Sequence, residues 1–313
     1  MLTQNQIDQF HSDGVLVVPD VLSLPTLSAV KHEYEVLLDD LYDGWHSDGQ
    51  VPEAADMDFW QKLLVSYEAG CDWFQPMDIS LPGGEVRPDT PFHFGPAVFD
   101  MITAPRLLDL VEGLLGPEIT SNPIQHVRLK PPAPTLRGSE DRAHIMATDW
   151  HQDRAVAHEE GDATQMVTVW LAVSDATVEN GCLQAIPGKP QMYPHCPKKQ
   201  TAIADGFLDL DKAQPLPVKA GGAVIFHPLT PHASLDNRSN QFRWSFDIRY
   251  NVTGQPTGRA HFPDFVVRSR AHPDRVLSDW QDWRDMWFEA RARLSGQPHI
   301  PIHRWKSDSP ACA

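Results

Sequence analysis

A histidine and an aspartate separated by one residue are the clearest chemical signal in this chain. His151 and Asp153 lie in the run Trp-His-Gln-Asp at 150–153. On an extended strand alternate side chains point to the same face, so the imidazole and the carboxylate are expected side by side. They supply two of the three ligands of a facial triad, the kind of site that holds Fe(II) in oxygenases. With 15 His and 42 acidic residues in the chain, a chance match on a surface strand is the alternative.

The third ligand of such a triad must come from another segment. Two candidates, His227 and His232, follow the strand-like run AVIF. Turn residues at 236–240 predict a hairpin in which Ser234 lies opposite Arg243, with His232 on the same face. That register would place a metal ligand beside a serine and an arginine that grip a carboxylate, because the guanidinium fork matches one. For His227 two interpretations stay open: a residue near the metal or substrate, and an ordinary strand histidine.

The order of these residues resembles the phytanoyl-CoA dioxygenase family, whose members are Fe(II)- and 2-oxoglutarate-dependent oxygenases. That family shows HxD, a distant His, then a Ser two residues and an Arg eleven residues after that His. Three further segments resemble family segments: IDQFHSDGVLVVPDVLS, TVWLAVSDATVENGCLQAIPG and HASLDNRSNQFR. The resemblance covers roughly residues 1–250, and its specific motifs lie in 128–250.

Carried onto this sequence, the resemblance implies two sets of site residues. The implied iron ligands are His151, Asp153 and His232. The residues implied to bind 2-oxoglutarate are Arg243, which pairs with its distal carboxylate, Ser234, Lys130 in the LKPP run, and Trp170. An ordinary strand-end lysine is the alternative for Lys130.

Two details bear on the reaction. Related halogenases carry a small residue in place of the carboxylate ligand, which leaves a position for chloride, so Asp153 favours hydroxylation or another oxidative transformation. The PGSH run of the family is replaced by Pro-Gly-Lys-Pro at 187–190. Because the missing histidine is not an iron ligand, we expect an altered pocket shape rather than lost catalysis.

The expected reaction consumes 2-oxoglutarate and O2 at Fe(II), releases succinate and CO2, and oxidises a C–H bond of a small molecule. Ascorbate is an expected supporting reductant. The alternatives are a non-catalytic metal-binding jelly-roll module and an acyl-CoA hydroxylase, although no Lys/Arg cluster typical of CoA binding is evident. Substrate determinants are expected in 43–100, in 154–165 and after Pro190.

Short β-rich runs separated by turns occupy about residues 119–252. They are IQHVRLK, ATDWHQD, QMVTVWLAV, CLQAIPG, AVIFHP and FRWSFDIRYNV. Such regular short strands favour a sandwich or barrel over a parallel α/β sheet. Together with the resemblance they predict a mainly β fold with flanking helices around a double-stranded β-helix, the jelly-roll or cupin-like core. We expect one domain over 1–313.

Helices are predicted on both sides of this β-core. Thr3 and Gln6 resemble a capping box that opens a short helix ending near residues 13–14, before a strand at 15–18. Apolar periodicity predicts further helices at 25–41, 58–67, 105–115 and 278–294. The last of these carries a tryptophan stripe that is typical of core packing.

Composition excludes several classes of partner. A formal net charge of −16 and a pI near 5.3 argue against nucleic acid and against an anionic membrane. The N-terminus lacks a secretory pattern, and no window is apolar enough to span a bilayer. Four cysteines without CxxC pairing are expected to be reduced thiols of a cytoplasmic protein: Cys71, Cys182, Cys196 and Cys312. The oligomeric state stays open.

Overall fold

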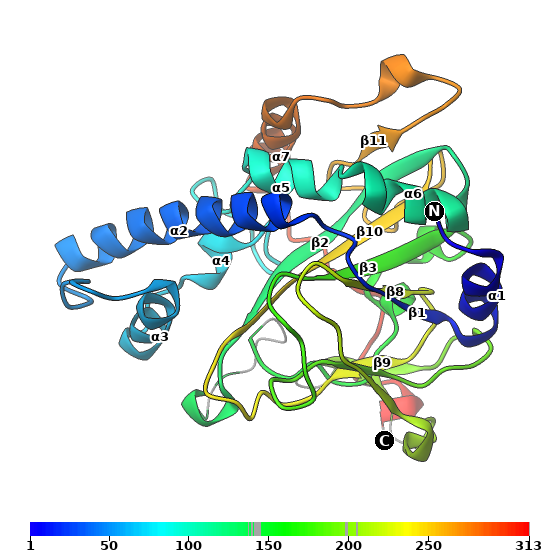
Figure 1. Ribbon diagram of the computed structural model, residues 1–313, viewed down its shortest axis with the longest axis horizontal. Helices are drawn as coiled ribbons and strands as arrows, with labels where there is room; N and C mark the ends of the chain where they lie inside the picture. The colour runs from blue at the N-terminus through cyan, green and yellow to red at the C-terminus, as the bar shows by residue number, and fades with distance from the viewer. Residues whose placement is uncertain (137, 139, 141–144, 198–199, 205, 313) are drawn as a thin grey trace.

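An antiparallel sheet of six strands forms the centre of the computed structural model, which describes residues 1–136, 138, 140, 145–197, 200–204 and 206–312 (Figure 1). In spatial order its strands are β1 (Val15–Val18), β8 (Ala223–Phe226), β3 (Met166–Ala172), β10 (Arg243–Val252), β2 (Ile119–Lys130) and β11 (Phe265–Arg268). A second sheet contains β7 (Gln214–Leu216), β4 (Leu183–Ala185) and β9 (His232–Ser234). A separate pair is formed by β5 (His195–Pro197) and β6 (Thr201–Ile203).

The two larger sheets pack face to face. Side chains of β3 and β8 form one apolar cluster with side chains of β4 and β7: Trp170, Ala172, Val224, Phe226, Leu183, Ala185 and Leu216. Two antiparallel sheets around a shared interior are the jelly-roll arrangement. The predicted fold class is therefore confirmed. The main sheet also includes β1 and β11, which lie outside residues 119–252.

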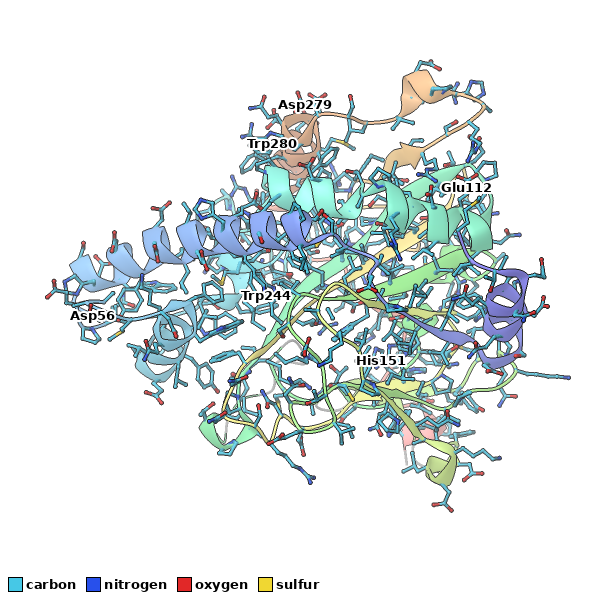
Figure 2. All side chains as sticks on the ribbon, viewed as in Figure 1. Asp56, Glu112, His151, Trp244, Asp279 and Trp280 are labelled. Carbon is cyan, nitrogen blue, oxygen red and sulfur yellow. A yellow bond between two sulfur atoms is a disulfide. The ribbon has the colours of Figure 1, made fainter. Side chains whose placement is uncertain are left out.

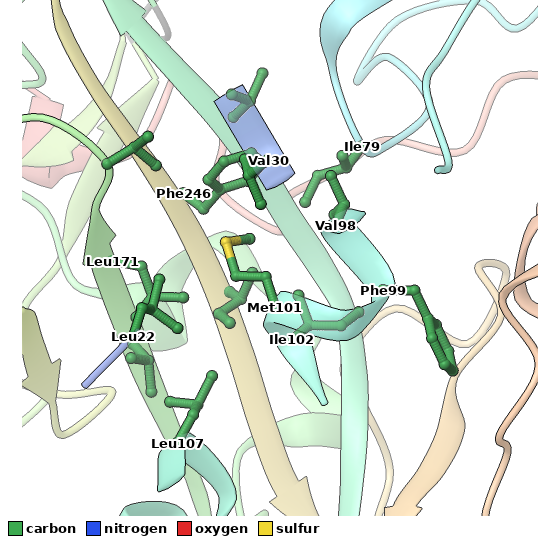
Figure 3. Close-up of a cluster of buried hydrophobic side chains, with 14 of the residues drawn as sticks. Leu22, Val30, Ile79, Val98, Phe99, Met101, Ile102, Leu107, Leu171 and Phe246 are labelled. Atoms are coloured by element: carbon green, nitrogen blue, oxygen red, sulfur yellow. The ribbon is translucent and has the colours of Figure 1, made fainter. Parts of the chain in front are cut away.

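Helices cover the opposite face of the main sheet (Figure 1). They include α2 (Leu24–Ser47), α5 (Pro96–Ile102), α6 (Pro105–Leu115) and α7 (Trp280–Leu294). Figure 3 shows Leu171 and Phe246 of the sheet together with Val30, Val98, Met101, Ile102 and Leu107 of the helices. Because strand side chains alternate, one face of β10 is apolar and the other is polar. Its helix-side residues are Trp244, Phe246, Ile248 and Tyr250, and its interior residues are Arg243, Ser245, Asp247 and Arg249.

Helix boundaries follow the predicted local signals. The α1 helix (Gln4–Asp13) has the expected capping box, and α6 begins and ends where its proline and glycine predict. The α2 helix runs six residues beyond the predicted end at 41. The helix predicted at 58–67 is present as α3 (Phe59–Ala69), whereas the short helix α4 (Phe74–Met77) was not predicted.

The predicted hairpin at 236–240 is wrong. Strand β9 pairs with β4 in the small sheet, where Ser234 faces Leu183, whereas β10 lies between β2 and β3 in the main sheet. Turn residues cannot distinguish a hairpin from a crossing between two sheets, because both need a reversal of the chain. Ser234 and Arg243 nevertheless line one cavity, since the two sheets face each other.

Two of the four cysteines are not the expected thiols. Cys196 and Cys312 form a disulfide with Cα atoms 5.3 Å apart, while Cys71 and Cys182 are buried and do not take part in that disulfide. The two cysteines are separated by 116 residues, so no local spacing of cysteines predicts this disulfide. Residues 198, 199 and 205, in the segment after Pro190 expected to bear on the substrate, lie outside the described residues. No described helix is long and apolar enough to cross a membrane.

Candidate active site

Three buried side chains converge at one end of the space between the sheets. The ligand atoms of His151, Asp153 and His232 all lie within 4.8 Å of one another. Nε2 of His151 is 3.9 Å from Oδ1 of Asp153, and Nε2 of His232 is 3.8 Å from its Oδ2. In the part of the chain that the structure describes, no other three His, Cys, Asp or Glu side chains meet this way. The predicted grouping is therefore present in space.

The prediction that His151 and Asp153 share one face of a strand is wrong, because residues 147–153 do not form a strand. His151, whose position is labelled in Figure 2, makes one isolated antiparallel bridge with His232. The bridge consists of N–H···O contacts of 2.9 and 3.0 Å. Asp153 instead begins the 3₁₀ helix η2 (Asp153–Val156). A single bridge followed by a tight turn, rather than strand alternation, brings both side chains to the same point.

Each histidine is held in the tautomer that a metal ligand requires. Nδ1 of His151 lies 2.8 Å from the carbonyl oxygen of Asp149, and Nδ1 of His232 lies 3.0 Å from that of Thr230. A carbonyl oxygen only accepts, so Nδ1 carries the proton and Nε2 presents its lone pair toward Asp153. Burial, and then the neighbouring His232, lowers the pKa of His151 to about 3, which keeps its ring neutral.

The carboxylate of Asp153 is held from one side by a buried arginine. Arg249 donates Nη2–H to Oδ1 and donates Nη1–H to the carbonyl oxygen of Ile124 at 2.9 Å. Burial alone would raise the pKa of Asp153, but Arg249 and the two histidines outweigh it and lower the pKa. Oδ2 is buried without a hydrogen-bond partner. Two neutral imidazole nitrogens and one carboxylate oxygen are the donor set of an Fe(II) facial triad, and the orphaned Oδ2 fits a metal at this position.

A second polar group contributes Ser234, Arg243 and Trp170 to the lining of the same cavity. Nζ of Lys130 donates to Oγ of Ser234 at 2.6 Å, and Lys130 pairs across the β2–β10 ladder with Arg243. The Arg243 guanidinium lies over the Trp170 ring, 5.0 Å from its centroid, and donates to the carbonyl oxygen of Gly181 at 2.6 Å. The four predicted 2-oxoglutarate residues are therefore close together.

These two cations are buried without a counter-charge. Among the described residues no carboxylate forms an ion pair with Lys130 or Arg243, and Nε of Arg243 has no hydrogen-bond partner. Burial, and then the charge of Arg243, lowers the pKa of Lys130 well below its usual value. Burial, and then the charge of Arg128, lowers the pKa of Arg243 to about 9. An arginine at that pKa is still cationic at neutral pH. Two desolvated cations with no anion are a suitable place for a carboxylate ligand.

His227 and His158 do not line this cavity. His227 follows β8, where its Nδ1 accepts the N–H of Leu229 at 3.1 Å and its ring lies near Phe10. The ordinary interpretation of His227 therefore agrees best with its contacts. His158 lies against the carbonyl oxygen of Pro301 at 2.6 Å. The substituted run at 187–190 ends in exposed residues that do not line the cavity.

Sequence reasoning missed several charged residues that face the interior. Arg128 and Asp247 line the cavity and form an ion pair at 3.1 Å, and Arg249 holds the carboxylate ligand. For Asp247 and Arg249 the signal was the period-two run Arg-x-Ser-x-Asp-x-Arg at 243–249, which places polar side chains on one face.

A family model described as Phytanoyl-CoA dioxygenase (PhyH) matches residues 10–245, more than half of the chain. A "Probable phytanoyl-CoA dioxygenase" of Caenorhabditis elegans is 28% identical over 231 residues, which is 65% of this chain and 72% of that protein. The peroxisomal phytanoyl-CoA dioxygenase of Bos taurus is 30% identical over 193 residues, 58% of this chain, and the match spans only 52% of the bovine protein. A methylphosphonate hydroxylase of Gimesia maris is 30% identical over 122 residues, 38% of this chain and 47% of that protein.

Two solved structures have a similar fold. The non-heme monooxygenase ThoJ superimposes with a TM-score of 0.58 at 18% identity, covering 93% of this chain and 97% of its own. EvdO2 from Micromonospora carbonacea var. aurantiaca, solved with 2-oxoglutarate, gives 0.51 at 19% identity, covering 81% and 92%. At this identity the likeness concerns the fold. The family match is what confirms the predicted enzyme class, a dioxygenase that uses iron, 2-oxoglutarate and O2. The chain belongs to the phytanoyl-CoA dioxygenase family.

Proposed function

We propose that this protein is an active Fe(II)- and 2-oxoglutarate-dependent dioxygenase that hydroxylates a C–H bond of a polar small molecule. The iron ligands in this proposal are His151, Asp153 and His232. The residues that bind 2-oxoglutarate are Arg243, Ser234, Lys130 and Trp170. One observation carries the proposal: the cavity lined by His151 and His232, which converge on Asp153, is also lined by Arg243, a buried cation without a carboxylate partner among the described residues.

The bound iron and 2-oxoglutarate supply the oxidising chemistry, in which co-substrate, O2 and R–H become succinate, CO2 and R–OH. The protein's own residues bind and orient. The Trp170 ring and the Gly181 carbonyl fix the Arg243 guanidinium, while Ser234 is fixed by Lys130 and by the N–H of Thr148 at 2.8 Å. These fixed partners would hold one end of the co-substrate in a single orientation.

Asp153 supports hydroxylation over halogenation. Its carboxylate is present, deprotonated and held by Arg249, so a third protein ligand is available for the metal. A halide would need that coordination position to be open.

The charged lining of the cavity supports a polar substrate. Arg128 and Asp247 line the cavity together with His151 and His232, and their side chains are only 13% and 11% exposed. An apolar acyl chain placed there would remove the remaining water from two charges without replacing its hydrogen bonds, which is unfavourable. The Gimesia maris relative is described as acting on methylphosphonate, a small anion, which agrees with this choice. The mammalian relatives are described as acting on phytanoyl-CoA, so an acyl-CoA ester is the competing substrate class.

Succinate release tests the proposal. Purified protein with Fe(II), 2-oxoglutarate and ascorbate is screened against two panels, polar metabolites and acyl-CoA thioesters, and succinate is measured. We expect stimulation by members of the polar panel. His151→Ala and Asp153→Ala should abolish succinate formation, while Arg243→Ala should raise the 2-oxoglutarate requirement and leave metal binding intact. Stimulation by acyl-CoA esters alone would refute the substrate class. Binding of iron and 2-oxoglutarate with no succinate under any condition would favour a non-catalytic binding module.

Within this proposal the protein acts as one domain over 1–313 and works in the cytoplasm. The acidic net charge of −16 supports a small-molecule partner rather than nucleic acid.

A further inference from the structure

The C-terminal segment 303–312 lies against the loop that carries two of the proposed iron ligands. Nε1–H of Trp305 donates to the carbonyl oxygen of Ala155 at 3.0 Å. Arg304 donates to the carbonyl oxygen of Arg154 at 3.0 Å and pairs with both carboxylate oxygens of Asp162 at 2.6 Å. These contacts bind the segment to the turn that begins at Asp153, although the two are about 150 residues apart in sequence.

His195 connects this segment to the residue between the two ligands. Its side chain is completely buried, and its Nε2 accepts the backbone N–H of Gln152 at 3.0 Å. Its Nδ1 faces the carbonyl oxygen of Tyr193 at 2.9 Å, which fixes the proton on Nδ1 and leaves Nε2 as the acceptor. The His195 ring stacks on Trp305, with centroids 5.2 Å apart and planes 27° apart. Gln152, His195 and Trp305 therefore form a continuous chain of contacts.

The disulfide fastens both parts of this arrangement. Cys196 directly follows His195 in β5, and Cys312 ends the 3₁₀ helix η6 (Pro310–Cys312). The bond therefore ties the segment 303–312 to the strand that presents His195. Without it, the residues after Trp305 would be held by weaker contacts, and segments held by few contacts open locally more easily.

We propose that His195 and Trp305 are positioning residues for the iron ligands, and that the Cys196–Cys312 disulfide is a redox-controlled fastener of that support. The proposal rests on the proposed function, because it concerns the same metal site. Reduction by a dithiol proceeds in two exchanges: one thiolate attacks Sγ of either cysteine, and the second thiol then releases the other. The products are the Cys196 and Cys312 thiols and the oxidised, disulfide form of the dithiol, so electrons and protons balance.

The support acts through orientation, so its loss should weaken metal binding without destroying it. Gln152 keeps other anchors, since its side chain donates to the carbonyl oxygens of Gln191 at 2.7 Å and Leu229 at 2.5 Å. Partners that orient metal ligands typically contribute ten- to a hundredfold in metal affinity. We expect the lower end, about tenfold, for a contact that reaches the ligands through one intervening residue.

Mn(II) is a suitable probe because it binds Fe(II) sites and does not oxidise under assay conditions. Its dissociation constant is measured for the full chain, oxidised and after dithiothreitol, and for Cys312→Ser. Reduction and Cys312→Ser should each raise the constant about tenfold, and reduction should not affect Cys312→Ser further. Cys71→Ser is the matched control, because Cys71 is a buried cysteine that takes no part in the Cys196–Cys312 disulfide. That control should bind Mn(II) like the parent chain and keep its response to reduction.

Two substitutions at His195 separate positioning from mere stability. His195→Gln keeps an acceptor for the Gln152 N–H, whereas His195→Leu removes it. We expect Mn(II) affinity to fall in His195→Leu and to be largely restored in His195→Gln, even where the apo forms of both melt at similar temperatures. A structural role alone would lower both melting temperatures and leave Mn(II) affinity unchanged.

Two results would overturn the inference: four titratable thiols in the unreduced, unfolded protein, or a Mn(II) dissociation constant that reduction changes by less than about twofold. Failure of the underlying metal site is distinguishable. If His151→Ala binds Mn(II) as tightly as the parent chain, the iron site itself is misassigned. If His151→Ala loses Mn(II) and reduction has no effect, only the fastener is refuted.

Discussion

Replacing Arg249 by glutamine should separate the folding of this protein from its metal binding. The Arg249 guanidinium is 3% exposed, and it is the cation that neutralises the buried Asp153 carboxylate. Removing one partner of a buried ion pair typically destabilises a protein by about 3–5 kcal/mol, because the other charge stays behind unpaired. For a chain of this size that loss corresponds to a fall in Tm of roughly 5–8 °C.

The same change should weaken metal binding by a smaller free energy. Arg249 holds Oδ1 of Asp153, and this contact leaves the unpartnered Oδ2 directed at His232. Without it the carboxylate can rotate, and burial raises its pKa with less opposition. A loss of ten- to a hundredfold in metal affinity, about 1.4–2.7 kcal/mol, is expected. Arg249→Lys keeps the charge but not the planar fork, so it should lie between the parent chain and Arg249→Gln.

Thermal unfolding of the apo protein and Mn(II) titration measure the two effects. Arg268→Gln is the matched control. Arg268 lies on β11, at the edge of the main sheet, and forms ion pairs with Asp109 at 2.7 Å and Glu112 at 2.8 Å. That variant should lose some stability and retain its Mn(II) affinity. An Arg249→Gln protein that bound Mn(II) within about threefold of the parent would refute the claim that Arg249 orients the carboxylate ligand.

Three further changes probe the co-substrate pocket and the buried histidine. Trp170→Leu removes the ring beneath Arg243, a contact worth about 0.5–2 kcal/mol, so the 2-oxoglutarate concentration for half-maximal succinate formation should rise by roughly two- to thirtyfold. Gly181→Ala should weaken 2-oxoglutarate binding as well, which isothermal titration would measure. The φ angle of Gly181 is +83°, and an added Cβ would lie 2.5 Å from the Leu235 carbonyl oxygen. The resulting shift of residue 181 would displace its own carbonyl, which accepts a hydrogen bond from Arg243. Burial lowers the pKa of His195 from 6.5 to about 4. The unfolded chain therefore binds this proton more tightly, and the free energy of unfolding should fall by up to roughly 3 kcal/mol as pH drops from 6.5 to 4; urea unfolding should show His195→Gln with a shallower slope.

Local signals predicted the parts of the fold that depend on neighbours in sequence. Thr3 and Gln6 cap α1 because each satisfies an N–H group that the first helical turn leaves free. The α6 helix ends at Gly116, as its stop signal indicates. Long-range features were not predictable in the same way. The pairing of β9 with β4, and the disulfide across 116 residues, depend on how the sheets pack.

The sequence predicted which residues come together at the candidate site, but not how the fold brings them together. The family resemblance supplied His232 and Arg243, but the expected hairpin between them does not exist, since their strands lie in different sheets. His195 had no signal at all, because an acceptor for one backbone N–H leaves no pattern in the sequence. Arg249 did have a sequence signal, because it falls on the polar face of the alternating run that forms β10.

The polar face of β10 explains why the metal site and the co-substrate site lie in one cavity. The strand is hydrogen-bonded on both sides, to β2 and β3, so its interior side chains cannot turn to solvent at a sheet edge. From one end to the other they are Arg243, Ser245, Asp247 and Arg249. Arg249 neutralises the carboxylate of Asp153 and Arg128 neutralises Asp247, whereas Arg243 has no acidic partner among the described residues. A strand that balances each interior charge except one cation is most stable with an anion bound at that end. This is the end at which the proposed co-substrate carboxylate would bind.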